Sequence, residues 1–313
     1  MAEFPDRVKK LIVEQTVQKE CEYKVKLYIN GERRLISVDD YFCVDQRTNE
    51  WAFTSSKENE IWVQLVEKAW AKACGTYAKT IGGHCDEALY ALTGAPTEKL
   101  VLEDMEVDEL WEELSKADKK KYIMGCAVGS EDYDGEHDYK GLASNHAYTL
   151  IGVLVVDGER LVRLRNPWGN VEWQGDWCDS SELWTPDLRR EHGVTDANDG
   201  VFHMTVEDFQ SEYDSVTICK VHDNYTFENV KCEKIAKGNG SFFTLKKKQH
   251  VFLTLSQKMY RQYSRDLCYY AFRSKLLLGR VSTSGGGVEL VGHRSKYHKQ
   301  NTVIEAYLEP GTY

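Results

Sequence analysis

The chain contains 313 residues with a mass of 36.0 kDa, a length that suggests about two domains. Hydrophobic residues make up 42% and aromatic residues 12% of the sequence, which excludes a disordered chain. The net charge of −10 argues against a nucleic-acid-binding protein, because such proteins carry a basic face. No segment approaches the roughly 20 apolar residues of a membrane-spanning helix. The first residues, MAEFPDRVKK, lack the apolar centre of a secretory signal.

Nine cysteines are spread along the chain without a Cys-x-x-Cys pair. This pattern favours reduced thiols and a cytoplasmic location over a disulfide framework. Cys74 and the pair His84-Cys85 form one short cluster of possible zinc ligands, but no second pair matches it. We therefore expect no structural zinc.

The first predicted elements along the chain are a hairpin and two helices. Residues 22–53 contain short alternating runs around Asn30-Gly31, a turn typical of a β-hairpin. Apolar residues recur at helical spacing through residues 58–75, and Gly75 supplies a C-terminal stop. A second helix is expected at 107–120, with lysines at the end where the helix dipole favours cations. The polar, acidic segment 131–145 predicts a mobile loop.

From Ala147 onward the pattern becomes that of β-structure. The segments AYTLIGVLVV, RLVRLRNPWG, VFHMTVEDF and SVTICKV predict an antiparallel sheet, with a turn at Asp157-Gly158 between the first two. Beyond residue 225, the segments FFTLKKKQHVFLTLSQ, DLCYYAFRS, VELVGH and NTVIEAYLEPGTY predict short strands separated by turns. About five or six strands fit there, whereas a β-sandwich ordinarily has seven or eight. We therefore expect an incomplete sandwich.

The charge is divided at the same boundary. Residues 225–313 carry 15 Lys and Arg against 6 Asp and Glu, a net of +9, so the preceding residues carry −19. Modules of opposite sign can dock on one another, and the basic one can lie on an anionic membrane surface. A solvated basic face without any partner is the third alternative.

His146 and Asn166 are the residues whose placement suggests chemistry. His146 starts one strand of the predicted sheet and Asn166 ends the next, so the two side chains can meet at one edge of the sheet. An Asn oxygen that accepts from one imidazole nitrogen fixes the tautomer and leaves the other nitrogen to serve a nucleophile. The indole of Trp168 can shield that bond from water. A structural role is the more common one for such a pair, and the spacing by itself does not decide.

The sequence segments around these residues resemble those of the calpain family of papain-like cysteine proteases. The resemblance is carried by SNHAYTLIG, by RNPWG with the following EWQGDW, and by the helix EIWVQLVEKAWAKACG; it continues through DGVFHMTVEDF and EPGTY. It spans most of the chain, and it implies that His146 is the catalytic base and Asn166 its orienting partner.

One departure from the family pattern concerns the nucleophile. The family's catalytic cysteine stands in a Gly-x-Cys-Trp context, and no cysteine of this chain does. The resemblance implies that the segment bearing this cysteine would precede Met1. Cys21, Cys43, Cys74 and Cys85 are the thiols that could substitute, but none is followed by Trp or expected at a helix N-terminus, so we interpret them as inert.

The resemblance implies an α+β fold with three parts. Residues 1–94 would be the remnant of the N-terminal, helical lobe of a papain-like protease core, residues 95–224 the sheet-rich lobe with His146 and Asn166, and residues 225–313 the incomplete calpain-type antiparallel β-sandwich. The implied function is intracellular, calcium-dependent limited proteolysis of protein substrates, and without the nucleophile we expect no turnover by this chain. The alternatives are a non-catalytic scaffold that binds a protein partner, calcium or anionic lipid, and a fragment of a complete protease.

Calcium is the cofactor that the resemblance implies. The family's ligands in the sheet-rich lobe correspond to Glu172, Asp179 and Asp199, with a backbone carbonyl near Ala197, while Val201 stands where the family has a Glu. Calcium binds six to eight oxygens, so the loss of one carboxylate predicts a weak site rather than none. The alternative is that Asp199-Gly200 is an ordinary turn and Glu172 a solvated residue. For the basic C-terminal part, the resemblance to lipid-binding β-sandwiches favours weak attraction to anionic phospholipid.

Overall fold

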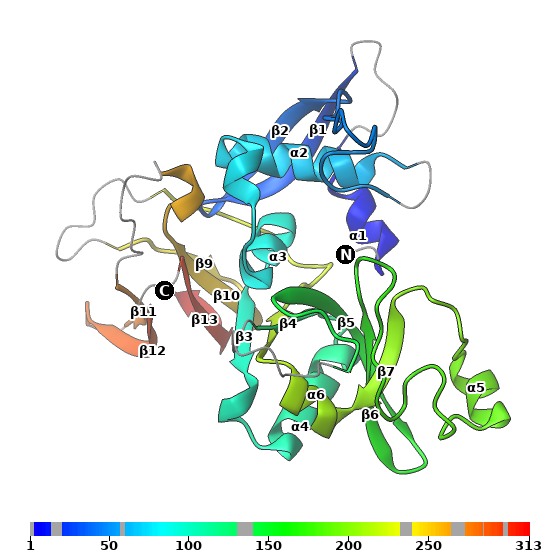
Figure 1. Cartoon of the computed structure of the whole chain (residues 1–313). Coiled ribbons are helices and arrows are strands. Elements are labelled where there is room, and N and C mark those ends of the chain that lie inside the picture. The colour runs from blue at the N-terminus through cyan, green and yellow to red at the C-terminus, as the bar shows by residue number, and fades with distance from the viewer. Residues whose placement is uncertain are drawn as a thin grey trace. The chain divides into compact units, whose positions relative to one another are not determined.

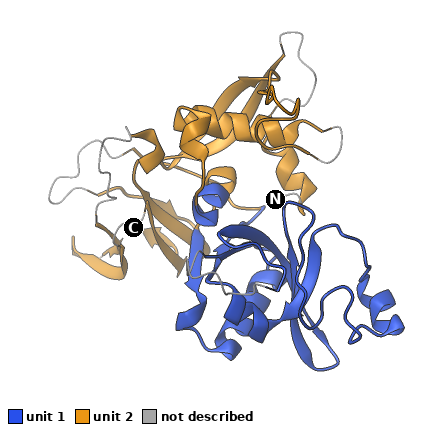
Figure 2. Cartoon of the chain, viewed as in Figure 1, with its two compact units in different colours: residues 1, 84–90, 97–223 blue, residues 2–83, 91–96, 224–313 orange. Residues whose placement is uncertain are grey.

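The structure is a computed structural model that describes residues 3–13, 21–56, 60–129, 140–231, 240–263, 273–283, 285–296 and 300–313. The chain forms two compact units (Figure 2), one of residues 1, 84–90 and 97–223 and the other of residues 2–83, 91–96 and 224–313. Both units contain helices and strands, so the predicted α+β class is confirmed. The second unit joins residues that the sequence assigned to two separate domains, and the three-domain division stays a prediction.

The first unit is built on a six-stranded antiparallel sheet that includes β4, β5, β6 and β7 of Figure 1. The strand order is β3-β8-β4-β5-β6-β7. The strands are β3 (Thr97–Val101), β4 (Ile123–Val128), β5 (His146–Val156), β6 (Glu159–Arg165), β7 (Val201–Thr205) and β8 (Ser215–Cys219). The helices are most of α3 (Cys85–Thr93), α4 (Val107–Lys119), α5 (Pro186–His192) and α6 (Val206–Glu212), with a 3₁₀ turn η2 (Leu102–Asp104). The antiparallel sheet predicted from Ala147 onward is confirmed, and β3 and β4 add to it.

The core of this unit lies between the sheet and helices α4 and α6. Leu110 and Leu114 of α4 and Phe209 of α6 are fully buried, and they belong to one cluster with Leu164 of β6 and Phe202 of β7. Burying such side chains contributes about 1.5–3 kcal/mol each, so this cluster supplies much of the unit's stability. It also fixes β5, β6 and β7, the strands that carry the candidate site.

Strands β5 and β6 form the hairpin that the sequence predicted. Its turn contains Asp157 and Gly158 with φ of +49° and +91°, the left-handed pair that a tight two-residue hairpin turn requires. From the turn the register runs back to Thr149 opposite Arg165, with one irregularity between Leu150 and Gly152. The beginning of β5 and the end of β6 therefore lie at the same edge of the sheet.

Several elements differ from the sequence-based expectation. The segment VFHMTVEDF is a strand only as far as Thr205, whose hydroxyl then accepts from the Asp208 amide at 3.0 Å and begins α6. This is an N-cap, which ends the strand and starts a helix within one residue. Strands β3 and β4 and helices α3 (Cys85–Thr93) and α5 were not predicted. Most of the predicted loop 131–145 lies outside the described residues.

The second unit contains the following elements. They are α1 (Pro5–Lys9), β1 (Glu22–Ile29), β2 (Glu32–Asp39), α2 (Trp62–Cys74), η1 (Tyr77–Thr80), the end of α3, β9 (Thr244–Leu245), β10 (Gln249–Ser256), η3 (Tyr260–Gln262), β11 (Ser274–Val281), β12 (Val288–Lys296), β13 (Asn301–Leu308) and β14 (Gly311–Thr312). The strands pair antiparallel as β1-β2, β10-β13, β11-β12 and β9-β14. The predicted hairpin at Asn30-Gly31 and the predicted helix ending at Gly75 are both confirmed, although the hairpin ends at Asp39.

The segment around η3 packs against the N-terminal elements of the same unit. Met259 is buried in one cluster with β1, β2 and α2, and its amide donates to the Asn30 side chain at 2.9 Å. The Arg261 guanidinium is 5% exposed and donates to the backbone carbonyls of Lys79 and Gly82. These bonds tie Arg261 to η1 and to Gly82 just beyond it, about 180 positions away in the sequence.

The β-sandwich expected beyond residue 225 stays a prediction. Three of the four predicted segments contain strands: the first contains β9 and β10, VELVGH begins β12, and the last contains β13 and β14. Most of DLCYYAFRS lies outside the described residues, and β11 was not predicted. Within the described ranges, no helix is both long enough and apolar enough to span a bilayer.

Candidate active site

The hairpin of β5 and β6 brings His146 and Asn166 together. His146 is the first residue of β5, and Asn166 directly follows the last residue of β6. The His146 Nε2 atom lies 3.0 Å from the Asn166 Oδ1 atom, which is a hydrogen bond. The pair forms at the edge of the sheet where the sequence analysis expected the two side chains to meet.

The Asn166 amide is held in one orientation by the loop that follows it. Its Nδ2 donates to the carbonyls of Asn170 at 2.8 Å and Val171 at 2.9 Å, and its Oδ1 also accepts from the Trp168 amide at 3.1 Å. The side chain is completely buried. Because the Asn oxygen can only accept, the hydrogen of the neutral imidazole is on Nε2 and the lone pair is on Nδ1. The site therefore holds His146 in the tautomer that a proton acceptor at Nδ1 requires.

Two aromatic rings flank His146. The Trp168 indole lies over the imidazole, with ring centroids 4.0 Å apart and an interplanar angle of 36°. Trp168 is 57% exposed, so it separates the His146–Asn166 bond from solvent on one side while its outer face remains open. Tyr148 presents its ring at 81° to the imidazole with centroids 5.0 Å apart. The imidazole is thus confined between one exposed ring and one buried ring.

Gly200 closes the long segment that leaves the sheet at Asn166. The Asn166 amide donates to the Gly200 carbonyl at 2.8 Å, and the Gly200 amide donates to Glu172 Oε1 at 2.7 Å. Gly200 has φ of +87°, and a Cβ there would lie 2.6 Å from the Asn166 carbonyl oxygen. Both the conformation and the space therefore require glycine.

Among the described residues, His146 is hydrogen-bonded to Asn166 and packs against the rings of Trp168 and Tyr148, and no cysteine is hydrogen-bonded to it. Seven described cysteines carry free thiols. Cys85 begins α3, so the expectation that no cysteine lies at a helix N-terminus was wrong. Burial and the neighbouring Asp86 nevertheless raise the pKa of the Cys85 thiol, and burial raises the pKa of Cys126 well above its usual range. These two thiols are therefore poor thiolate nucleophiles.

The three predicted calcium ligands lie on the segment between β6 and β7. Asp199 Oδ1 accepts from the Val201 amide at 2.9 Å, and Glu172 accepts from Gly200. Burial, together with the charges of Glu172, Asp199 and Asp196, raises the pKa of Asp179 to about 7. The carboxylates therefore crowd one another electrostatically, as ligands of a cation do in its absence. However, no three His, Cys, Asp or Glu side chains among the described residues are close enough together to hold a metal ion.

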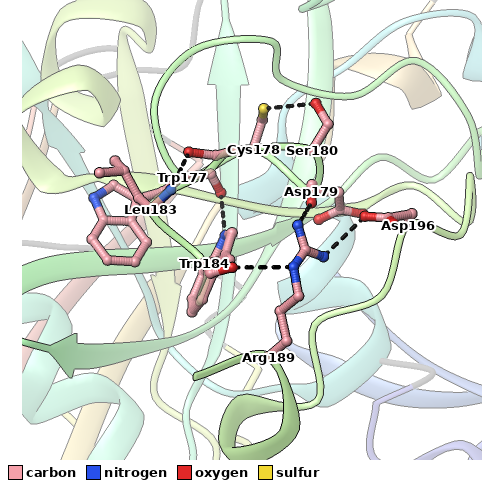
Figure 3. A network of polar contacts seen from close by, with 9 residues as sticks. Trp177, Cys178, Asp179, Ser180, Leu183, Trp184, Arg189 and Asp196 are labelled. Carbon is pink, nitrogen blue, oxygen red and sulfur yellow. Dashed lines mark hydrogen bonds and ion pairs between the residues drawn. The ribbon is translucent and has the colours of Figure 1, made fainter. Parts of the chain in front are cut away.

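A partly buried cation, Arg189, already lies in this segment, and the sequence did not predict its role. Figure 3 shows the Arg189 guanidinium between the backbone carbonyl of Asp179 and the carboxylate of Asp196. Its Nη1 lies 2.9 Å from Asp196 Oδ1, and its Nε donates to the Trp184 carbonyl at 3.3 Å. Arg189 lies on the short helix α5, whose capping residues Thr185 and Gly193 are recognisable in the sequence.

Comparison with known proteins identifies the family. The sequence model described as Calpain family cysteine protease matches residues 1–220. The chain is 34% identical over 224 residues to a protein named calpain-type cysteine protease ADL1 of Oryza sativa subsp. japonica, covering 69% of this chain and 10% of the relative. It is 35% identical over the same length to calpain-type cysteine protease DEK1 of Arabidopsis thaliana, again 10% of the relative.

A human relative, calpain-14, is 36% identical over 192 residues, covering 59% of this chain and 28% of the relative. The chain thus spans about a tenth of the plant relatives and under a third of the human one. The family match covers well over half of the chain and includes both residues of the His146–Asn166 pair. The chain belongs to the calpain family of cysteine proteases.

Proposed function

We propose that the first unit carries the proton-transfer half of a calpain-type cysteine endopeptidase site. In this proposal His146 is the catalytic base and Asn166 is its orienting residue. The observation that supports it is the 3.0 Å bond from His146 Nε2 to an Asn166 amide whose own donors are fully used. That bond leaves the basic lone pair on Nδ1, the atom that would take a proton from a thiol.

In the proposed reaction His146 acts first as a base and then as an acid. The proton of a cysteine thiol moves to His146 Nδ1, the thiolate attacks the scissile carbonyl, and the imidazolium returns the proton to the leaving amine. Water then hydrolyses the thioester, with His146 again as base. No cysteine of this chain stands in the Gly-x-Cys-Trp context, so we propose that the chain alone does not turn over peptides.

A peptidase assay with matched variants tests this proposal. We expect no cleavage of casein or a fluorogenic peptide by the chain with calcium, before or after thiol alkylation. Alkylation-sensitive cleavage that His146→Ala abolishes would refute the inactivity and confirm the role of His146. His84→Ala is the control, because His84 is exposed and is not part of the pair.

The same pair can be tested without turnover. Nitrogen NMR of the imidazoles should show His146 with its hydrogen on Nε2. In Asn166→Ala, His146 should no longer be held in this one tautomer. A His146 ring hydrogen that remains on Nδ1 in the unmodified chain would contradict the proposed geometry. The alternative function is a non-catalytic scaffold that keeps the fold for binding. A scaffold would also show no cleavage in the peptidase assay, but it would not require His146 to be fixed in one tautomer.

Calcium binding by Glu172, Asp179 and Asp199 remains part of the proposal. Burial raises the pKa of Asp179, and repulsion from Glu172 and Asp199 raises it further; a cation would relieve that repulsion, which supports the site. The expected affinity is weak, since Glu172 and Asp199 already accept backbone hydrogen bonds and Val201 supplies no carboxylate. Calorimetric titration of the full chain tests the site, and Val201→Glu should tighten it. No heat and no thermal shift at millimolar calcium would exclude it.

The basic C-terminal part supports a proposal about anionic membranes. Lys246 and Lys247 are exposed, and β12 presents exposed apolar side chains at Val288 and Leu290. Exposed basic and apolar side chains in the same part of a chain suit a membrane surface, at about 1 kcal/mol for each suitably placed Lys. We propose that this part, as an incomplete β-sandwich, binds phosphatidylserine-containing vesicles from the cytoplasmic side.

Vesicle co-sedimentation decides this second proposal. Vesicles that contain phosphatidylserine should bind the chain, neutral vesicles should not, and Lys246→Gln with Lys247→Gln should weaken the binding. Lys119→Gln, at an exposed position of the first unit, is the matched control. Equal binding to both kinds of vesicle at low salt would contradict the proposal.

A further inference from the structure

Tyr148 touches both the candidate base and the segment that leads into it. Its ring meets the His146 imidazole edge to face, with centroids 5.0 Å apart. Its hydroxyl oxygen accepts a hydrogen bond of 2.7 Å from the backbone amide of Ala143, three residues before His146. Tyr148 lies two residues after His146 on β5, so both side chains project from the same face of the sheet.

The segment between Ala143 and His146 needs such support. Asn145 has φ of +51°, a left-handed conformation that Asn tolerates better than other residues with a Cβ, although glycine alone adopts it without a steric penalty. Its amide donates to the Gly129 carbonyl at 3.0 Å, just after the end of β4. Two hydrogen bonds, from Ala143 to Tyr148 and from Asn145 to Gly129, thus fix the chain where it turns into His146.

The Tyr148 ring is packed inside the core, which holds it in place. It is 2% exposed and packs edge to face against Phe202 of β7 at 6.0 Å and against Tyr213 at 5.4 Å. Phe202 is fully buried, and Tyr213 is 3% exposed. Tyr148 therefore links the rigid core of the first unit to the backbone that carries His146.

We infer that Tyr148 is a positioning residue for His146, acting through its hydroxyl on the Ala143 amide and through its ring on the imidazole. The inference rests on the proposed function in one respect: the position of His146 matters because His146 is proposed to be the catalytic base. Loss of the hydroxyl leaves the Ala143 amide without its acceptor, and the turn into His146 loosens. The imidazole then spends more time away from Asn166 Oδ1.

The chain offers a matched control for this effect. Tyr213 is a neighbouring buried tyrosine of the same cluster, and its hydroxyl has no hydrogen-bond partner among the described residues. Tyr148→Phe and Tyr213→Phe therefore remove the same atom from the same core, but only the first removes a hydrogen bond. A role of Tyr148 in packing alone predicts no difference at His146 between the two variants.

The readout is the Nε2 hydrogen of His146, observed by NMR in the full chain without substrate. We expect Tyr148→Phe to speed its exchange with water about fivefold, the factor that corresponds to one lost hydrogen bond, and to shift the His146 ring resonances. Tyr213→Phe should leave both unchanged. Equal effects of the two variants, or no effect of Tyr148→Phe, would overturn the inference.

A second variant keeps the test decisive if Tyr148→Phe does not fold. Ala143→Pro removes the same hydrogen bond from the donor side and leaves Tyr148 intact. It should produce the same change at the Nε2 hydrogen of His146, and an unchanged signal would overturn the inference. None of these measurements uses peptidase activity, so a failed peptidase proposal and a failed positioning role can be distinguished.

Discussion

His203 gives the sharpest test of how burial controls stability in the first unit. It lies on β7, is 3% exposed, and packs at 67° against the Trp184 indole with centroids 5.2 Å apart. Neither ring nitrogen has a hydrogen-bond partner among the described residues. Burial, followed by the positive charges of Arg163 and His192, lowers the pKa of His203 from 6.5 to about 4. We predict that His203→Phe stabilises the protein, most strongly in mild acid.

The magnitude follows from the two pKa values. The folded state binds the His203 proton less readily than the unfolded state does. The unfolding free energy of the wild type therefore does not depend on His203 protonation above about pH 6.5, and it decreases as the pH falls from 6.5 toward 4. The full loss is about 3 kcal/mol, at about 1.4 kcal/mol for each pH unit between the two values, and about 2 kcal/mol of it should be gone by about pH 5. Phe has no proton to bind, and it removes a buried donor that costs about 1–3 kcal/mol when unpaired.

Urea unfolding of wild type and His203→Phe near pH 7.5, 6 and 5 measures this effect. The difference in unfolding free energy between the two proteins reports mainly on His203, since groups that do not interact with it titrate alike in both. We expect the difference to grow by about 2 kcal/mol over that range in favour of the variant. His84→Gln, a change of an exposed histidine, should show no such growth. A difference that stays constant with pH would refute the reasoning.

Three further predictions concern other buried or partly buried polar groups. Asn166→Ala should destabilise the chain by about 2–4 kcal/mol in urea unfolding, because two backbone carbonyls lose their donors. Asp179→Asn should raise the melting temperature at pH 8 and lose this advantage as the pH falls below about 7, because the raised pKa makes ionised Asp179 costly only at higher pH. Arg261→Ala should cost about 2–3 kcal/mol, since its guanidinium satisfies two backbone carbonyls; an unchanged urea midpoint would contradict this.

The parts of the fold that the sequence predicted are those with a local signal. The turn Asn30-Gly31 and the helix α2 each carry their pattern within a few consecutive residues, and both form as expected. Strand β4 lacks such a pattern, because it pairs with β5 and β8 inside the sheet and all but one of its residues are buried. A short apolar run of this kind does not distinguish a strand from a helix.

In the candidate site, too, the sequence predicted only the contacts that depend on a local turn. His146 and Asn166 could be paired from the sequence, since one tight turn at Asp157-Gly158 determines their register. Arg189 and Asp196 could not, because their partners depend on how the segment between β6 and β7 folds back. That segment contains no strand, so no ladder fixes the distances between its residues.

Asn166 is hydrogen-bonded to both ends of that segment, so movement of the segment reaches the site through this residue. The Asn166 side chain holds the first residues of the segment through Asn170 and Val171, and its backbone amide holds the last through the Gly200 carbonyl. Glu172 in turn accepts from the Gly200 amide. A cation that drew Glu172 away would therefore act on Gly200, and through one further hydrogen bond on the residue that orients His146. The proposed calcium ligands and the proposed catalytic pair are connected by two hydrogen bonds, so each is sensitive to strain in the other.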